Sequence, residues 1–118
     1  MKFWIVKNAW WMFWARGMVF WPFVFLKPKK VRANPKTEYQ RREAGQNKLA
    51  NTRIFRHELQ HVYQMKELGR LKFYWRYIKK RIRTGYRDNP YEEEAYNIDD
   101  TPLTAQEQHW RQQGKINV

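Results

Sequence analysis

Residues 53–68 read RIFRHELQHVYQMKEL and carry the clearest periodic pattern in the chain. On a helical wheel the apolar residues, Leu59 and Val62 among them, span an arc of about 200°. This arc is wider than a surface helix needs, so the pattern predicts a helix that the rest of the domain largely encloses. His57 and His61 lie towards one margin of the arc, where we expect a cleft to begin. The polar side of the helix carries Arg53, Arg56, Gln60, Gln64 and Glu67.

Within this helix two histidines, His57 and His61, are four residues apart, and Glu58 follows the first. That spacing stacks both imidazoles on one helical face, within reach of a single metal ion. Glu58 lies about 100° further round the helix, where it can hold a water molecule rather than act as a ligand. H-E-x-x-H is typical of zinc peptidases, but a chance occurrence is expected roughly once in a few hundred chains of this length. A true site also needs a third ligand downstream.

The composition limits what else the chain can be. At 118 residues it is large enough for one small domain, which we place over residues 1–118. Cysteine is absent, so a metal site must be built from histidine and carboxylate side chains. Aromatic residues make up 18% of the chain and can form a core from few, bulky side chains. The net charge of +13 predicts attraction to polyanions such as nucleic acid, anionic lipid or cell-wall polymers.

The N-terminal region, residues 1–26, is rich in aromatic and β-branched residues. Phe3–Trp14 and Met18–Leu26 are separated by Ala15–Gly17, and we predict two strands joined there as a hairpin. A helix over residues 3–14 is the alternative. Pro22 would interrupt a central strand, so the second strand should lie at an edge or carry a bulge. An edge strand is also where an extended substrate could pair with the main chain.

The same region has the apolar character of a signal peptide or membrane anchor, but its pattern fits neither. Lys7 and Arg16 interrupt it, and the longest apolar piece, Gly17–Leu26, is too short to span a bilayer and precedes no small-residue cleavage site. We therefore expect no transmembrane span. The localisation stays open between the cytoplasm and a virus particle.

A second helix is predicted over residues 70–83, after Gly69 ends the first with a left-handed cap. Its apolar face is expected to comprise Leu71, Tyr74, Trp75, Ile78 and Ile82. A basic stripe on another face comprises Lys72, Arg76, Lys79, Lys80 and Arg83. This stripe is either a solvated face or a docking surface for a polyanion.

A third helix is predicted to begin at Asn89, with Asn as its cap and Pro90 in the first position, after a loop over Thr84–Asp88. Glu92 is either the partner of Asn89 in a capping box or a metal ligand. Its neighbours Glu93 and Glu94 are the alternative ligands, or else solvent-facing charges that complement the helix dipole. Residues 98–118 are polar, with a short helix expected over 104–113.

Together, HELQH in a buried helix and the later Glu92–Ala95 segment resemble the gluzincins, zinc peptidases whose third ligand is a glutamate on a later helix. HELQHVYQ and NPYEEEAY also look like the minigluzincins and short bacterial and bacteriophage relatives. The resemblance covers roughly residues 54–97, within the helical region 51–97. It implies that Glu92 is the third zinc ligand, with Ala95 as its small partner. Tyr96 stands where larger gluzincins have an aspartate that orients a histidine, so Asp99 or a main-chain carbonyl would take that role.

The resemblance also implies an α+β fold, a minimal zincin-like domain in which an N-terminal sheet packs on the HExxH helix, the basic helix and the glutamate helix. Zinc would be held by His57, His61 and Glu92, and Glu58 would act as general base in hydrolysis of a peptide or protein substrate. The oxyanion that forms needs a second electrophile. The candidates are Tyr63, Tyr91, Tyr96, Arg87 and His109.

Two other functions remain open on the sequence. One is a non-catalytic metal-binding or structural component, for example of a phage particle, that acts through its basic and aromatic surfaces. The other is a polyanion-binding or membrane-surface module in which HELQH is coincidental, since aromatic residues interleaved with basic ones suit base stacking and interfacial anchoring. No RNA-binding or helix-turn-helix signature accompanies them.

Overall fold

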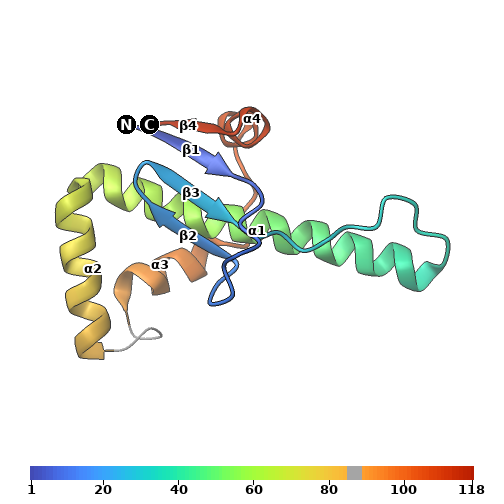
Figure 1. The fold of residues 1–118 in the computed structure, drawn as a ribbon, viewed down its shortest axis with the longest axis horizontal. Coiled ribbons are helices and arrows are strands. Elements are labelled where there is room, and N and C mark those ends of the chain that lie inside the picture. Colours follow the sequence, from blue (N-terminus) through green and yellow to red (C-terminus); the bar gives the residue numbers. More distant parts are fainter. Residues whose placement is uncertain (85–88) are drawn as a thin grey trace.

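A four-stranded sheet lies against one long helix in the computed structural model, which describes residues 1–84 and 89–118 (Figure 1). The described elements confirm the expected α+β class. Of the predicted loop over Thr84–Asp88, residues 85–88 lie outside the described part. In chain order the elements are β1 Lys2–Val6, β2 Gly17–Phe20, β3 Phe23–Leu26, α1 Glu38–Leu68, α2 Arg70–Thr84, α3 Pro90–Ile98, α4 Ala105–Gln113 and β4 Lys115–Asn117.

The sheet has the strand order β2-β3-β1-β4, with β1 parallel to β3 and the other pairs antiparallel. The predicted hairpin between residues 3–14 and 18–26 is wrong. The hairpin lies within 17–26, where Trp21 and Pro22 form the turn between β2 and β3. Proline has no N–H that could donate a hydrogen bond to a neighbouring strand. In a turn no such hydrogen bond is needed, so Pro22 does not disturb the strand pairing.

Residues 7–16 are neither the strand nor the helix considered for residues 3–14. They form a loop whose ends are tied to β3: Ala9 N donates to the Leu26 carbonyl at 2.9 Å, and Lys27 N donates to the Arg16 carbonyl at 2.8 Å. Ala9 and Met12 are fully buried. The loop therefore has a small core of its own, although most of its aromatic side chains are exposed.

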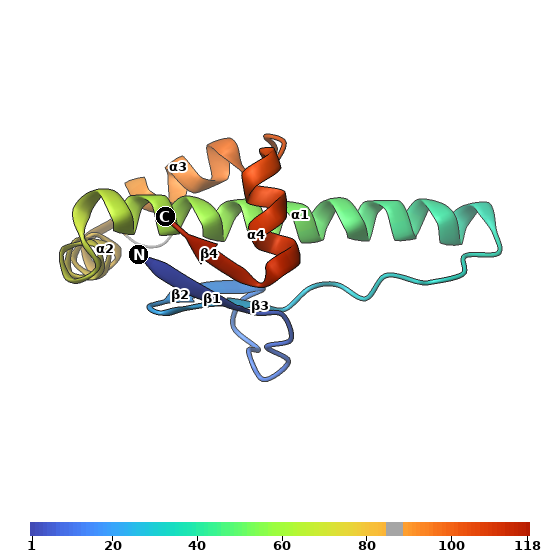
Figure 2. The same cartoon turned by 90° about the horizontal axis from the view of Figure 1, so that it is seen from above.

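Strand β4 was not expected in the polar C-terminal segment. Its central residue, Ile116, is fully buried and pairs with Phe3 of β1. Val118 N donates to the Met1 carbonyl at 2.9 Å, so the two chain ends lie side by side (Figures 1 and 2). Three residues are too few to show the alternation of apolar and polar side chains that predicts a strand, so pairing with β1 determines the conformation of β4.

The core lies between the inner face of the sheet and α1, with α3 and α4 on the same side of the sheet as α1 (Figure 2). Helix α1 begins at Glu38, well before the predicted segment, and Thr37 caps it by accepting from Gln40 N. Its N-terminal half extends beyond the sheet. The incoming chain lies alongside, where the Asn51 side chain bonds both Lys29 N (2.7 Å) and the Lys29 carbonyl (2.9 Å). These bonds stabilise a polar helical stretch that has little core to bury.

Helix α2 turns a different face to the core from the one predicted. Phe73 is buried and Tyr74 and Tyr77 are partly buried, whereas the expected apolar face is exposed except for Tyr74. The helix carries two neighbouring stripes of apolar residues, and only contacts with other elements decide which one is covered. Gly69 separates the helices with φ of 84° and ψ of 146°, so the predicted left-handed cap is wrong in ψ although the positive φ still favours glycine.

Candidate metal centre

Two helices bring three potential ligands together. The His57 and His61 rings lie side by side on α1, with centroids 5.0 Å apart, and α3 carries Glu92 against them. His57 Nε2 is 3.0 Å from Glu92 Oε2, and His61 Nε2 is 2.8 Å from Glu92 Oε1. Asn89 holds the start of α3 in place, because its side chain accepts from Tyr91 N at 3.0 Å. The exposed fraction is 9% for His57 and lower for the other two residues.

The three side chains could together hold a metal ion. Each offers one nitrogen or oxygen atom, and these atoms lie within 4.8 Å of one another. Tetrahedral zinc with bonds of about 2.0–2.2 Å needs ligand atoms about 3.4 Å apart. His61 Nε2 is buried and, despite its short distance to Glu92, makes no hydrogen bond of acceptable geometry. A buried nitrogen directed at a carboxylate in this way is suited to sharing a metal with it.

The charge state of Glu92 also suits a ligand. Burial alone would raise its pKa, but the hydrogen bond with His57 and the close approach of the His61 ring hold the pKa of Glu92 well below its usual range. Burial would lower the pKa of His61, but the adjacent Glu92 carboxylate, the charge of Glu58 and the hydrogen bond with Gln64 together outweigh burial and raise it. Glu92 is therefore an ionised carboxylate facing two imidazoles. Tyr77, which belongs to no motif in the sequence, donates its hydroxyl to Glu92 Oε1 at 2.9 Å.

Gln64 orients His61. Its Oε1 lies 2.8 Å from His61 Nδ1, and its Nε2 donates to the Tyr91 carbonyl at 3.0 Å. Gln64 was expected on the polar side of the helix but is only 5% exposed. A hydrogen bond at Nδ1 sets the tautomer that leaves Nε2 free to bind a metal. Asp99, suggested as an orienting residue, places Oδ2 4.0 Å from His57 Nδ1.

We expect Gln64→Ala to weaken zinc binding by about 10- to 100-fold, because the buried His61 ring loses its orienting partner. Competition with a chromophoric chelator measures this affinity. Gln60→Ala is the matched control one helical turn away, since Gln60 bonds Glu94 rather than a histidine. Equal zinc affinities for wild type and Gln64→Ala would contradict the assigned role.

Glu58 lies beside this centre in a cleft. It is 6% exposed, and burial raises its pKa despite the nearby histidines. Gly17, at the start of β2, lies directly against it: a Cβ added there would be 2.8 Å from Glu58 Oε1. The cleft is lined by Trp14, Ala15, Arg16, Gly17, Arg53, Ile54, His57, Glu58, Arg81, Tyr96 and Asp99.

The suggested oxyanion donors lie in different places. Tyr96 lines the cleft, with its ring 4.6 Å from the His57 ring. Tyr63 lies on the other side of α1 from His61 and donates its hydroxyl to Glu107 Oε2 at 2.6 Å. His109 is exposed on α4 and does not line the cleft. Of the remaining two, Tyr91 packs its ring on Phe73, and Arg87 lies outside the described residues.

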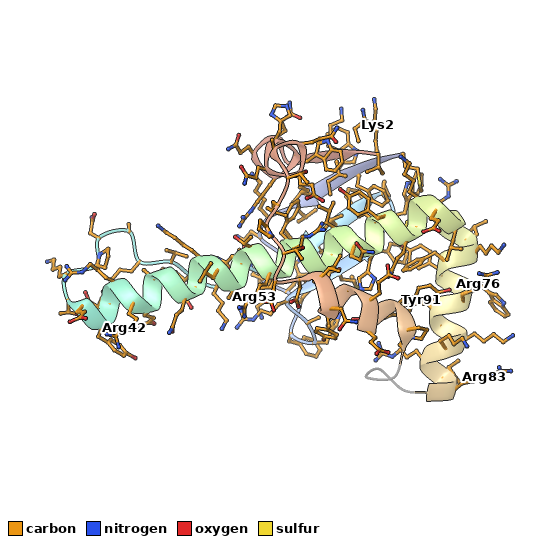
Figure 3. All side chains as sticks on the ribbon, turned by 180° about the vertical axis from the view of Figure 1, so that it is seen from behind. Lys2, Arg42, Arg53, Arg76, Arg83 and Tyr91 are labelled. Carbon is orange, nitrogen blue, oxygen red and sulfur yellow. The ribbon has the colours of Figure 1, made fainter. Side chains whose placement is uncertain are left out.

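The other two glutamates of α3 do not reach the histidines in the described structure. Glu93 and Glu94 are exposed, and Glu94 accepts hydrogen bonds from Gln60 and Gln64. The basic residues predicted as a stripe are exposed on α2, where Arg76 and Arg83 lie along its outer side (Figure 3). They are Lys72, Arg76, Lys79, Lys80 and Arg83.

No protein-family model, curated protein or solved structure matches this chain. Among the described residues, none of the helices combines the length and apolar character that crossing a bilayer requires.

Proposed function

We propose that this chain is a small zinc-dependent metallopeptidase with a zincin-like domain and a gluzincin-type ligand set. The observation that carries the proposal is the convergence of His57, His61 and Glu92 from two helices, with Glu58 in the adjoining cleft. A capping role alone would leave Glu92 facing Asn89. Its carboxylate instead contacts both histidines.

Zinc held by these three residues would supply a Lewis acid that lowers the pKa of water and polarises a carbonyl group. Glu58 then acts as the general base. Its raised pKa suits it to take a proton from the attacking water and to return it to the leaving amine. Gln64 orients the His61 imidazole, and Tyr96, which lines the cleft beside the His57 ring, is the proposed donor to the developing oxyanion.

The substrate proposed here is an extended peptide. Strand β2 is an edge strand, and its first residue, Gly17, lies against Glu58. A peptide that pairs with the free edge of β2 would pass along the cleft beside the catalytic carboxylate. Main-chain pairing gives affinity for many sequences, so we expect broad specificity.

Proteolysis of a mixed peptide library tests the proposal. We expect cleavage by zinc-loaded wild type, loss of cleavage on chelation and its recovery when zinc is returned. Glu92→Gln should lose both zinc and cleavage, whereas Glu93→Gln, exposed on the same helix, should keep both. Stoichiometric zinc binding without any cleavage would instead support the non-catalytic alternative.

Gly17→Ala is expected to lower the rate of peptide hydrolysis by about 10- to 100-fold, because displacing Glu58 by even 1 Å misaligns the base. The new methyl group would lie 2.7 Å from Glu58 Cγ. Zinc content should not change, since neither residue is a ligand. Gly45→Ala is the control because a Cβ there meets nothing within 4 Å. Equal rates for Gly17→Ala and Gly45→Ala would contradict this placement of Glu58.

A further inference from the structure

The outer face of the sheet is apolar over β2 and β3, and no described helix covers it. The strand register places Phe20, Phe23 and Trp4 in one row across β2, β3 and β1. Their exposed fractions are 61%, 39% and 49%. Figure 2 shows α1, α3 and α4 on one side of the sheet and the 7–16 loop on the other. This face therefore exposes aromatic side chains at positions where a sheet face in contact with water normally carries polar ones.

The 7–16 loop extends this face. Its buried Met12, whose carbonyl accepts from Lys27 Nζ at 2.9 Å, anchors a loop that exposes Trp10 and Phe13 by 74% and 89%. The Trp11 ring contacts Phe25 of β3 edge-on at 5.4 Å, so the loop is joined to the sheet face. Its aromatic side chains are held outwards by a packed base.

Helix α2 adds an apolar stripe, formed by Leu71, Trp75, Ile78 and Ile82, which are 52–80% exposed. Tyr74 joins this stripe to the sheet, because its hydroxyl accepts from Trp21 N at 2.6 Å and its ring contacts Phe20. Leu71 and Ile78 are three residues before and four after Tyr74, and so they lie on the same side of α2. The apolar surface thus continues from the sheet onto the helix.

The surroundings of this surface are strongly basic. No acidic residue precedes Glu38, and the sheet and the 7–16 loop carry Lys2, Lys7 and Arg16, with Lys27 directly after β3. On α2, each of the four residues in the apolar stripe is directly followed in the sequence by a residue of the basic stripe. A helix with an apolar stripe flanked by lysine and arginine is suited to lie in the interface of an anionic membrane. Tryptophan favours that same interface.

We propose that the outer sheet face, the 7–16 loop and the apolar stripe of α2 form a docking surface for an anionic phospholipid bilayer. Single-stranded nucleic acid also stacks on exposed aromatic residues. Leu71, Ile78 and Ile82 of α2, however, are aliphatic and offer nothing to a base, whereas they suit the acyl region beneath lipid headgroups. Trp14 and Arg16 line the catalytic cleft, so docking would bring that cleft to the membrane surface. The docking itself needs no metal.

Co-sedimentation with phosphatidylcholine vesicles, with and without phosphatidylglycerol, tests this surface in the presence of a chelator. We expect binding only to the phosphatidylglycerol vesicles, with a blue shift of tryptophan emission. Two double variants, Trp10→Ser with Phe13→Ser and Trp75→Gln with Ile82→Gln, should each bind about tenfold more weakly. Tyr39→Ser, a substitution at a 76% exposed aromatic residue outside the surface, should bind as wild type does.

Three results would overturn the proposal: no sedimentation with phosphatidylglycerol vesicles, wild-type binding by both double variants, or an equal loss in Tyr39→Ser. An oligonucleotide titration completes the test. The surface would be assigned to nucleic acid instead if wild type bound the oligonucleotide but not the vesicles, and if the Trp10→Ser, Phe13→Ser variant lost the oligonucleotide binding. Circular dichroism checks that each variant keeps its helices.

Discussion

Replacing Glu58 by glutamine is expected to lower kcat/KM for peptide hydrolysis by about a thousandfold, the scale of a lost general base. Glutamine has nearly the same shape, but its amide cannot accept a proton from water. Because Glu58 is not one of the three proposed ligands, the variant should keep its zinc. Peptide cleavage under matched zinc loading measures the effect.

Glu67→Gln is the matched control, since Glu67 is exposed on the same helix. It should cleave as wild type does. If Glu58→Gln retained the wild-type rate with full zinc content, this result would contradict the general-base role of Glu58. It would not contradict the proposed metal site.

The second large effect concerns stability. Glu107→Ala is expected to lower the free energy of unfolding by about 3–5 kcal/mol, because it breaks a buried ion pair. The Glu107 carboxylate accepts from Arg56 Nη1 at 2.8 Å, from Tyr63 Oη at 2.6 Å and from Thr104 N at 2.8 Å. Without it, a largely buried guanidinium loses its carboxylate partner and keeps only the hydrogen bond to Thr101 among those described. Urea denaturation near neutral pH measures the change.

The pH dependence of this contribution has a definite sign. Burial would raise the pKa of Glu107, but hydrogen bonds from Thr104 and Tyr63 hold it below the ordinary value. The folded state therefore binds a proton at Glu107 more weakly than the unfolded state does. The stabilisation is present above the pKa that Glu107 has in the unfolded chain, and it is lost as the pH falls through the lower pKa of Glu107 in the folded protein. Glu43→Ala, at an exposed site on α1, should change stability by no more than about 0.5 kcal/mol. A loss in Glu107→Ala no larger than this control's would contradict the buried-pair account.

The parts of the fold that the sequence predicted are those with local signals. The wide apolar arc around HELQH correctly predicted an enclosed helix, and Asn89 before Pro90 marked the start of α3. Thr104 also begins a helix, with Glu107 closing its capping box. Each signal lies within one turn of the residues it orders, so no tertiary information was needed.

The errors arise where distant segments decide the outcome. Pro22 was placed in a strand, yet it lies in the β2–β3 turn, and β1 pairs in parallel with β3 across the 7–16 loop. Gln64 was assigned to a polar surface because a helical wheel registers polarity alone. Its amide is buried because His61 and Tyr91 satisfy it. Long-range pairing and buried polar networks leave no periodic trace in the sequence.

The central claim is that one zinc ion binds His57, His61 and Glu92. Anomalous diffraction at the zinc absorption edge, from crystals of the wild-type chain grown with zinc, tests it most directly. We expect a single peak about 2.0–2.2 Å from both Nε2 atoms and from a Glu92 carboxylate oxygen. Crystals without a peak between these three side chains would contradict the account.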